Sequence, residues 1–271
     1  MSFNSKKQLI SFLAEDIGRG DITSALLAKK RITVKIISRE KAIVAGVIHA
    51  KEIFKLKGCS AKILKKDGSK IKPNQIIMTI TGDAAKVLMC ERTALNLLTR
   101  MSGIATQTNF LVKKIPSKIK LYATRKTAPG LRYFDKEAVE IGGGKKHRLR
   151  LDEMVMIKDN HIAIHDSLEE LIKKAKKKHK KFEVEVENIS EAILAAKNGA
   201  AIIMLDNFTP SQIKKAIVTL KNQKLRSKVL LEASGGINSK NITAYGMTGV
   251  DIISVGSITN SVKGIDMSLE I

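Results

Sequence analysis

Positively charged side chains gather in one part of this sequence, between residues 125 and 150. This stretch holds four of the ten arginines, and its segment GGGKKHRLRL carries five cationic or potentially cationic side chains within six residues. Arginine binds planar carboxylates and phosphates through two parallel hydrogen bonds. Like charges brought together cost stability unless an anion neutralises them. We therefore expect a site for a carboxylate-rich substrate, with these candidate side chains: Arg125, Lys126, His147, Arg148 and Lys158.

Two acidic residues, Glu187 and Asp206, follow successive apolar runs that are typical of strands. Acids in such positions can bind ribose hydroxyls, hold Mg²⁺ through oxygen ligands or stabilise a cationic transition state. The alternative is a salt bridge to a neighbouring lysine, which is compatible with a functional role. We expect the two carboxylates to approach each other at the mouth of one site.

Two glycine-containing turns, ASGGIN and SVGSIT, follow the last two apolar runs. In α/β barrels the final two strand-to-helix turns commonly bind phosphate through backbone N–H groups. Taken singly, such turns usually just connect elements. Together they predict a phosphate site at Ser234, Gly235, Gly236, Gly256 and Ser257.

Lys126 and Lys158 have an alternative interpretation as Schiff-base nucleophiles. Such a lysine needs a lowered pKa, which burial and neighbouring guanidinium groups favour. Spacing along the chain does not exclude a lysine-dependent barrel lyase.

The elements that carry these residues alternate between β-branched apolar runs and helical segments from about residue 118 onward. This alternation predicts right-handed βαβ crossovers and a parallel sheet. Polar residues follow each run, as expected where the strands of an α/β barrel end at its active site. We predict an incomplete barrel of six or seven strands, with strands at 118–124, 154–158, 182–187, 201–205, 228–233 and 251–256.

The first part of the chain has a different rhythm, with a short helix at 7–15, strand-like runs and a long helical pattern at 84–101. It predicts a separate small α+β domain. We place the N-terminal domain at 1–103 and the barrel at 104–260, and a tail at about 261–271 can pack back on the first domain.

The net charge of +23 raises the possibility of nucleic-acid binding. However, the lysines are dispersed, tryptophan is absent and aromatic residues are few, so no specific nucleic acid is expected. The run KKAKKKHKK at 173–181 is typical of the solvated face of an amphipathic helix.

No apolar run is long enough to span a membrane, and the first residues do not fit a signal peptide. We therefore expect a cytoplasmic protein. Cys59 and Cys90 have no spacing typical of zinc sites, which favours two buried, reduced thiols.

The motif TRKTAPGLRYFDKEAVEIGGGKKHRLRLDEMVMIKDNHI at 124–162 closely resembles the signature of the quinolinate phosphoribosyltransferase family. Further matches follow in the same order along nearly the whole chain: EDIGRGDIT, ERTALNLLTRMSGIAT, EVEVEN, IIMLDN, LEASGGI and GVDIISVGSIT. The resemblance implies an N-terminal α/β sandwich domain and an incomplete α/β barrel. It also implies transfer of a phosphoribosyl group from phosphoribosyl pyrophosphate to quinolinate, with Mg²⁺, yielding nicotinate mononucleotide, pyrophosphate and CO₂ in NAD biosynthesis.

The resemblance also implies roles for individual residues. Positions matching Arg125, His147, Arg148 and Lys158 bind the two quinolinate carboxylates, and Thr127 belongs to the same substrate site. Lys126 lies between quinolinate and donor, as a catalytic residue with Glu187 and Asp206. The two acids address the ribose and the Mg²⁺, directly or through the donor, and the two glycine turns receive the 5′-phosphate.

The resemblance also implies that Arg92 contributes to the active site of a partner subunit. We therefore expect a homodimer, and assembly of dimers into a higher oligomer stays an alternative. Without the resemblance, a surface ion pair with Glu91 would be favoured for Arg92. The chain departs from the family pattern at Lys146 and Arg150, which add charge without removing a ligand. A barrel phosphoribosyltransferase for another aromatic acid stays an alternative.

Overall fold

The computed structural model describes residues 4–271, which form two compact units. One unit contains residues 4–109, 127–143 and 258–271, and the other contains 110–126 and 144–257. The chain therefore passes between the units several times. The domain boundary predicted at residue 103 falls inside a continuous helix, α3 (Ala84–Val112).

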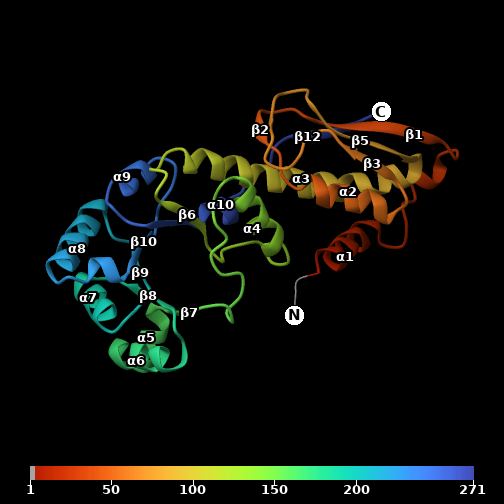
Figure 1. Cartoon of the computed structure of the whole chain (residues 1–271). Coiled ribbons are helices and arrows are strands. Elements are labelled where there is room, and N and C mark those ends of the chain that lie inside the picture. Colours follow the sequence, from red (N-terminus) through yellow and green to blue (C-terminus); the bar gives the residue numbers. More distant parts are fainter. Residues whose placement is uncertain (1–3) are drawn as a thin grey trace. The chain divides into compact units, whose positions relative to one another are not determined.

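The first unit is built on an antiparallel sheet with the strand order β12-β1-β5-β3 (Figure 1). The C-terminal strand β12 (Met267–Glu270) pairs with β1 (Arg31–Ser38), so the end of the chain adds a strand to the N-terminal sheet. The other strands are β5 (Ile76–Asp83) and β3 (Ser60–Ile63), and a two-stranded sheet joins β2 (Ala42–Ile43) to β4 (Lys70–Ile71).

Helices cover this sheet because its strands alternate between apolar and polar residues. Val34 and Ile36 of β1 are fully buried, whereas the intervening Thr33 and Lys35 are exposed. Helix α2 (Val47–Leu56) contributes a buried face and contacts β3. The remaining helical elements of this region are α1 (Ser5–Ile17) and the 3-10 helix Ser24–Leu26. Cys59 and Cys90 are buried free thiols, as expected, and burial raises the pKa of Cys90 to about 12.

Helix α4 (Arg132–Ile141) also belongs to the first unit and packs through Phe134 and Asp135, both fully buried. The Arg100 guanidinium of α3 binds Asp135 with two hydrogen bonds of 2.8 and 2.9 Å. Directly after α4, a Cβ on Gly142 would lie 2.5 Å from the carbonyl oxygen of Ala105. The first of the three consecutive glycines is therefore required for close packing against α3.

The second unit contains six parallel strands in the order β6-β11-β10-β9-β8-β7 (Figure 1). The strands are β6 (Lys120–Ala123), β7 (Val155–Ile157), β8 (Phe182–Val186), β9 (Ile202–Asp206), β10 (Leu230–Ser234) and β11 (Ile252–Val255). All six predicted strands are present, which confirms the incomplete barrel. Because all strands are parallel, their carboxyl ends lie along one edge of the sheet.

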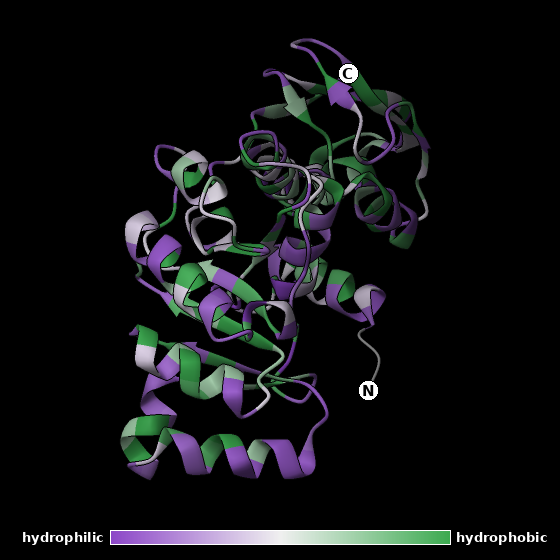
Figure 2. Cartoon of the chain, turned by 60° about the vertical axis from the view of Figure 1, so that its left-hand side comes forward, coloured by the Kyte–Doolittle hydropathy of each residue, from purple (hydrophilic) through white to green (hydrophobic). Residues whose placement is uncertain are grey.

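The connecting helices are α5 (Asp159–His165), α6 (Leu168–Lys178), α7 (Ile189–Lys197), α8 (Pro210–Asn222), the 3-10 helix Arg226–Lys228 and α9 (Ile242–Gly246), while α10 (Ser257–Asn260) leads out of the unit. Their starts carry the expected signals: Ser167, Asn188 and Thr209 each accept a hydrogen bond from a backbone N–H of the first turn. These helices carry both purple and green residues in Figure 2, as amphipathic helices on a sheet do.

Helix α6 confirms the interpretation of the lysine-rich run. Leu168, Ile172 and Ala175 are buried, and the lysines of the helix are exposed. Within residues 4–271, no helix has the length and apolar character needed to cross a membrane.

Candidate functional site

A cavity of about 390 Å³ opens at the carboxyl ends of the parallel strands in the second unit. Its wall is formed by residues in or directly after all six strands, β6 to β11, and by the loop before β7. The lining residues are Ala123, Thr124, Arg125, Lys126, His147, Arg148, Met156, Lys158, Glu185, Met204, Asp206, Glu232, Ser234 and Ser254. All five predicted cationic groups therefore share one cavity.

The loop that carries His147 and Arg148 is attached to the edge of the sheet by backbone hydrogen bonds. The N–H of Lys145 donates to Leu121, and the carbonyl of Lys145 accepts from Ala123, so this residue extends the sheet beside β6. The chain then turns at His147, whose φ is 53°. As a result, the imidazole packs edge-on against Tyr122 of β6, with ring centroids 5.3 Å apart.

Arg148 is only 8% exposed and is fixed by two partners on the β7 segment. Its Nη1 donates to the carbonyl oxygen of Met154 at 2.9 Å, and its Nη2 lies 3.4 Å from Sδ of Met156. Burial and then the charge of Arg125 lower the pKa of Arg148, while Glu183 opposes this shift. Two guanidinium groups thus act on one another electrostatically, which is the arrangement that an anionic ligand would stabilise.

Lys158 follows β7 and forms an ion pair with Glu185 of β8. Glu185 is nearly buried, with 9% of its surface exposed, whereas the Lys158 side chain is 38% exposed. Lys126 is exposed at the cavity wall. The cavity therefore offers one lysine that already neutralises a carboxylate and one that extends toward solvent.

The acidic side of the cavity differs from the sequence-based expectation. Asp206 lines the cavity at the end of β9, but Glu187 does not line it. Strand β8 ends at Val186, so Glu187 lies in the exposed turn before α7, where its N–H donates to Glu191. The expectation that Glu187 and Asp206 approach each other at the mouth of the site stays a prediction, and Glu185, two residues earlier, is the acid of β8 that lines the cavity.

The two glycine turns follow the neighbouring strands β10 and β11, which pair with each other. Ser234 lines the cavity, while Gly235, Gly236, Gly256 and Ser257 lie immediately beyond the strand ends and do not line it. Gly235 has φ of 91°, and a Cβ there would lie 2.1 Å from Oδ1 of Asn207. Only glycine fits this approach of the β10 turn to the β9 turn.

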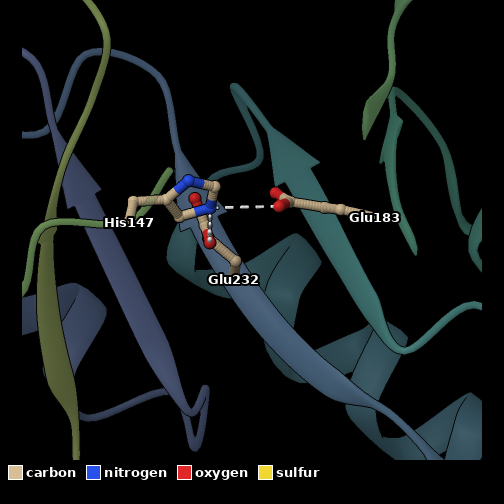
Figure 3. Close-up of side chains that lie close together, drawn as sticks. All are labelled: His147, Glu183 and Glu232. Carbon is tan, nitrogen blue, oxygen red and sulfur yellow. Dashed lines mark hydrogen bonds and ion pairs between the residues drawn. The ribbon is translucent and has the colours of Figure 1, made fainter. Parts of the chain in front are cut away.

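Two glutamates have no solvent exposure in this region: Glu232 of β10 lies at the floor of the cavity, and Glu183 of β8 lies beside it without lining the cavity. Nε2 of His147 lies 3.0 Å from Glu183 and 3.8 Å from Glu232, and it faces both carboxyl groups (Figure 3). Burial, followed by the charge of Glu183, raises the pKa of Glu232 well above its ordinary value, and the Ser254 hydroxyl and Lys158 oppose this shift only in part.

These two glutamates were not predicted as site residues, although the sequence contains a signal for them. Parallel strands covered on both faces are ordinarily continuous apolar runs. Strand β8 instead reads FEVEV and is buried throughout. Acidic residues at alternate positions of a buried strand indicate charge inside the barrel, where only a partner makes it tolerable.

Two predicted residues, Arg92 and Thr127, belong to the first unit. Arg92 is exposed on α3. Thr127 accepts a hydrogen bond from Nε of Arg132 at 3.2 Å. The cavity belongs to the second unit, so the substrate-binding roles expected for Arg92 and Thr127 stay predictions.

The fold and the cavity together define an enzyme of the α/β barrel type whose active site receives anions and contains carboxylates beside them. Sequence models of the N-terminal and C-terminal domains of quinolinate phosphoribosyl transferase match residues 21–102 and 104–270. Because these matches span most of the sequence, the chain belongs to the quinolinate phosphoribosyl transferase family.

Individual relatives agree with this assignment. The chain is 44% identical to a probable carboxylating nicotinate-nucleotide pyrophosphorylase of Methanothermobacter thermautotrophicus, over 94% of this chain and 95% of that protein. A protein of the same description from Methanocaldococcus jannaschii is 45% identical over 98% of this chain and 96% of its own length. The solved nicotinate-nucleotide pyrophosphorylase of Francisella tularensis superposes with a TM-score of 0.91 at 40% identity, covering 98% of this chain and 95% of that one. The predicted family, fold class and enzyme class are confirmed.

Proposed function

We propose that the cavity transfers the phosphoribosyl group of phosphoribosyl pyrophosphate to quinolinate, giving nicotinate mononucleotide, pyrophosphate and CO₂ in NAD biosynthesis. The observation that carries this proposal is the presence of cationic and acidic groups on the wall of one cavity. The cationic groups can bind the two carboxylates of a pyridine dicarboxylate, and the acidic groups can stabilise a ribosyl cation. Membership of the family supports the same reaction.

The cations provide the binding site for the aromatic diacid. Arg125, His147, Arg148 and Lys158 all line the cavity, and Arg148 is held in place by Met154 and Met156. A guanidinium held in this way loses little conformational freedom when a carboxylate binds to it. Lys158 can exchange its internal partner Glu185 for a carboxylate of the substrate.

Glu185 is the acid best placed to stabilise the ribosyl group as the bond from C1′ to pyrophosphate breaks. The ribose then acquires oxocarbenium character, and a nearby carboxylate lowers the energy of this state. The lone pair of the pyridine nitrogen forms the new bond to C1′ as the electron pair of the old bond leaves with pyrophosphate. Lys126, exposed at the cavity wall, is positioned to bind the anionic donor.

Decarboxylation follows from the charge of the product ring. When the bond from C2 to the 2-carboxylate breaks, CO₂ leaves and the electron pair stays on C2, where the positive charge of the adjacent pyridinium nitrogen stabilises it until a proton binds to it. Burial of the cavity floor favours loss of the charged carboxylate as a neutral gas.

Mg²⁺ and the phosphates of the donor fit other parts of the cavity wall. Asp206 offers carboxylate oxygens, the ligands that Mg²⁺ prefers. Asp206 would hold the ion, and Mg²⁺ bound there would supply positive charge to neutralise the pyrophosphate leaving group. We propose Asp206, without Glu187, for this ion, and the turns at Ser234 to Gly236 and Gly256 to Ser257 for the 5′-phosphate.

We further propose that the catalytic unit is a homodimer in which the exposed Arg92 reaches the cavity of the partner subunit. Its position on the surface of α3 leaves it accessible to another chain. Since the phosphorylated donor is highly charged and does not cross membranes freely, we propose that the enzyme acts in the cytoplasm.

Incubation with quinolinate, phosphoribosyl pyrophosphate and Mg²⁺ tests the proposal. Nicotinate mononucleotide and CO₂ are expected in equal amounts, and nicotinate in place of quinolinate should release no CO₂. Turnover of another aromatic acid without turnover of quinolinate would contradict the substrate assignment. Borohydride trapping of an adduct on Lys126 or Lys158 would instead support a lysine-dependent lyase.

A further inference from the structure

The carboxylates beneath His147 lie outside the set of groups that the proposed reaction uses. Glu183 has no solvent exposure, and one of its oxygens, Oε2, is 3.0 Å from Nε2 of His147. Its other oxygen, Oε1, is buried and accepts no hydrogen bond from a described residue. A charge in this position is costly unless it has a partner, and the partner that the geometry provides is the imidazole.

We propose that Glu183 is a positioning residue that orients His147 for binding the carboxylate of the aromatic substrate. The carboxylate accepts a hydrogen bond from Nε2–H of His147 and holds the ring against Tyr122. This bond determines the tautomer, because the nitrogen that faces Glu183 must carry the proton. Nδ1 is then the ring nitrogen left for the ligand, and because a carboxylate only accepts, Nδ1 must also carry a proton and donate it in the complex, with the Glu183 carboxylate balancing the charge of the ring.

Glu232 has a different role in the same cluster. Its carboxyl group lies 3.8 Å from Nε2, beyond hydrogen-bonding distance, and burial and the charge of Glu183 favour its protonated form. Glu183 is therefore the carboxyl group of the pair that acts directly on the imidazole. The other charged groups acting on this cluster are Arg148, Lys158 and Glu185.

A metal ion is the competing explanation for the cluster. The ligand atoms of His147, Glu183 and Glu232 all lie within 4.8 Å of one another, a spacing that a divalent ion could occupy after small shifts. The hydrogen bond of 3.0 Å between Nε2 of His147 and Oε2 of Glu183 pairs these two groups directly, without an ion between them. For that reason we favour a hydrogen-bonded pair over a metal centre.

A double-mutant cycle tests the proposal, which rests on use of the cavity for an aromatic diacid. Glu183→Gln removes the charge while retaining the shape, and the Kd for pyridine-2,3-dicarboxylate should rise about tenfold, the effect of losing one charge-assisted hydrogen bond. The KM for the phosphoribosyl donor should change by less than about twofold, since the proposal assigns His147 to the aromatic diacid and to no group of the donor. Adding Glu183→Gln to His147→Gln should cause no further loss, because Glu183 acts through His147.

Additive losses in the cycle, or an equal effect on both substrates, would overturn the proposal. So would a larger loss of dicarboxylate binding in Glu232→Gln than in Glu183→Gln, because the charge would then reside on Glu232. One equivalent of tightly bound divalent metal in the purified protein would also overturn it. Glu169→Gln, on the exposed face of α6, is the matched control for removing a glutamate charge.

A second measurement needs only the wild-type protein and His147→Gln, and it does not require catalysis. Proton NMR of the wild-type protein should show a downfield, slowly exchanging Nε2 proton that disappears in His147→Gln. Absence of this signal would contradict the hydrogen bond even if Glu183→Gln failed to fold. If the wild-type protein shows the signal but binds no pyridine dicarboxylate, the proposed substrate is wrong. The hydrogen bond between Glu183 and His147 would still be confirmed.

Discussion

Lys158 and Glu185 form an ion pair between neighbouring strands of the parallel sheet, at the end of β7 and near the end of β8. Both side chains line the cavity. The ion pair holds one cationic and one anionic side chain in the cavity when no substrate is bound. In the proposed reaction, a substrate carboxylate that binds Lys158 would leave Glu185 free to face the ribosyl group of the donor.

We expect Glu185→Gln to lower kcat by about 100-fold, the size of effect seen when one preorganised electrostatic group is removed. Glu187→Gln makes the same chemical change two residues later, in the exposed turn outside the cavity. It should change kcat by less than about threefold. Steady-state kinetics of both variants distinguish the two acids, and a larger loss in Glu187→Gln would contradict the assignment of Glu185.

Arg148→Lys should raise the KM for quinolinate by roughly tenfold or more, since lysine cannot replace a bidentate guanidinium. The KM for phosphoribosyl pyrophosphate should stay nearly constant. Arg150→Lys is the matched control, because the Arg150 side chain is 52% exposed and pairs with Asp152 and Glu153. Equal effects of the two substitutions would argue that Arg148 acts only through the net charge of the loop.

Arg100→Ala should lower the free energy of unfolding by about 3–5 kcal/mol, because it leaves the fully buried carboxylate of Asp135 without its partner. Arg39→Ala breaks an ion pair with Glu270 that is exposed on both sides, and about 0–1 kcal/mol is expected there. Urea unfolding of both variants measures the difference. A loss for Arg100→Ala no greater than that for Arg39→Ala would show that the buried pair contributes little.

The stability of the protein should depend on pH through Glu232. Its pKa in the folded state is raised above the ordinary value, so the folded state binds the extra proton and stability falls as pH rises from the ordinary carboxyl range toward the raised pKa. Glu232→Gln is neutral at every pH and should lose less stability than the wild-type protein as pH rises above the ordinary carboxyl range. Urea unfolding across this range, with Glu169→Gln as control, provides the measurement. Parallel pH profiles for Glu232→Gln and the wild-type protein would contradict the raised pKa.

Arg92→Ala and Arg125→Ala should each be almost inactive when tested alone. If Arg92 serves the neighbouring subunit, mixing the two variants should restore activity in mixed dimers, where one of the two sites is intact, to at most about one quarter of the wild-type level. Size-exclusion chromatography and exchange of labelled subunits confirm that mixed dimers form. No recovery after demonstrated exchange would place Arg92 outside the partner's site.

The sequence alone located the six strands of the second unit along the chain and predicted half of the residues that line the cavity. Periodicity identifies strands because buried parallel strands are short apolar runs, and parallel strands bring their following residues to one edge of the sheet. For this reason Arg125, Lys158 and Asp206 were predicted as neighbours although they are far apart in the chain. The dense positive charge of GGGKKHRLRL pointed to His147 and Arg148, whose loop has no periodic signal, and the resemblance to a family implied their role.

Only the tertiary structure decided which acid faces the cavity and which charges are buried. Side chains alternate between the faces of a strand until the strand ends, and the end of β8 at Val186 separates Glu185 from Glu187 by less than the error of a sequence-based boundary. The hydrogen bond between His147 and Glu183 joins the loop before β7 to strand β8. Such a contact depends on the left-handed turn at His147 and on the attachment of Lys145 to β6, and neither leaves a pattern in the sequence.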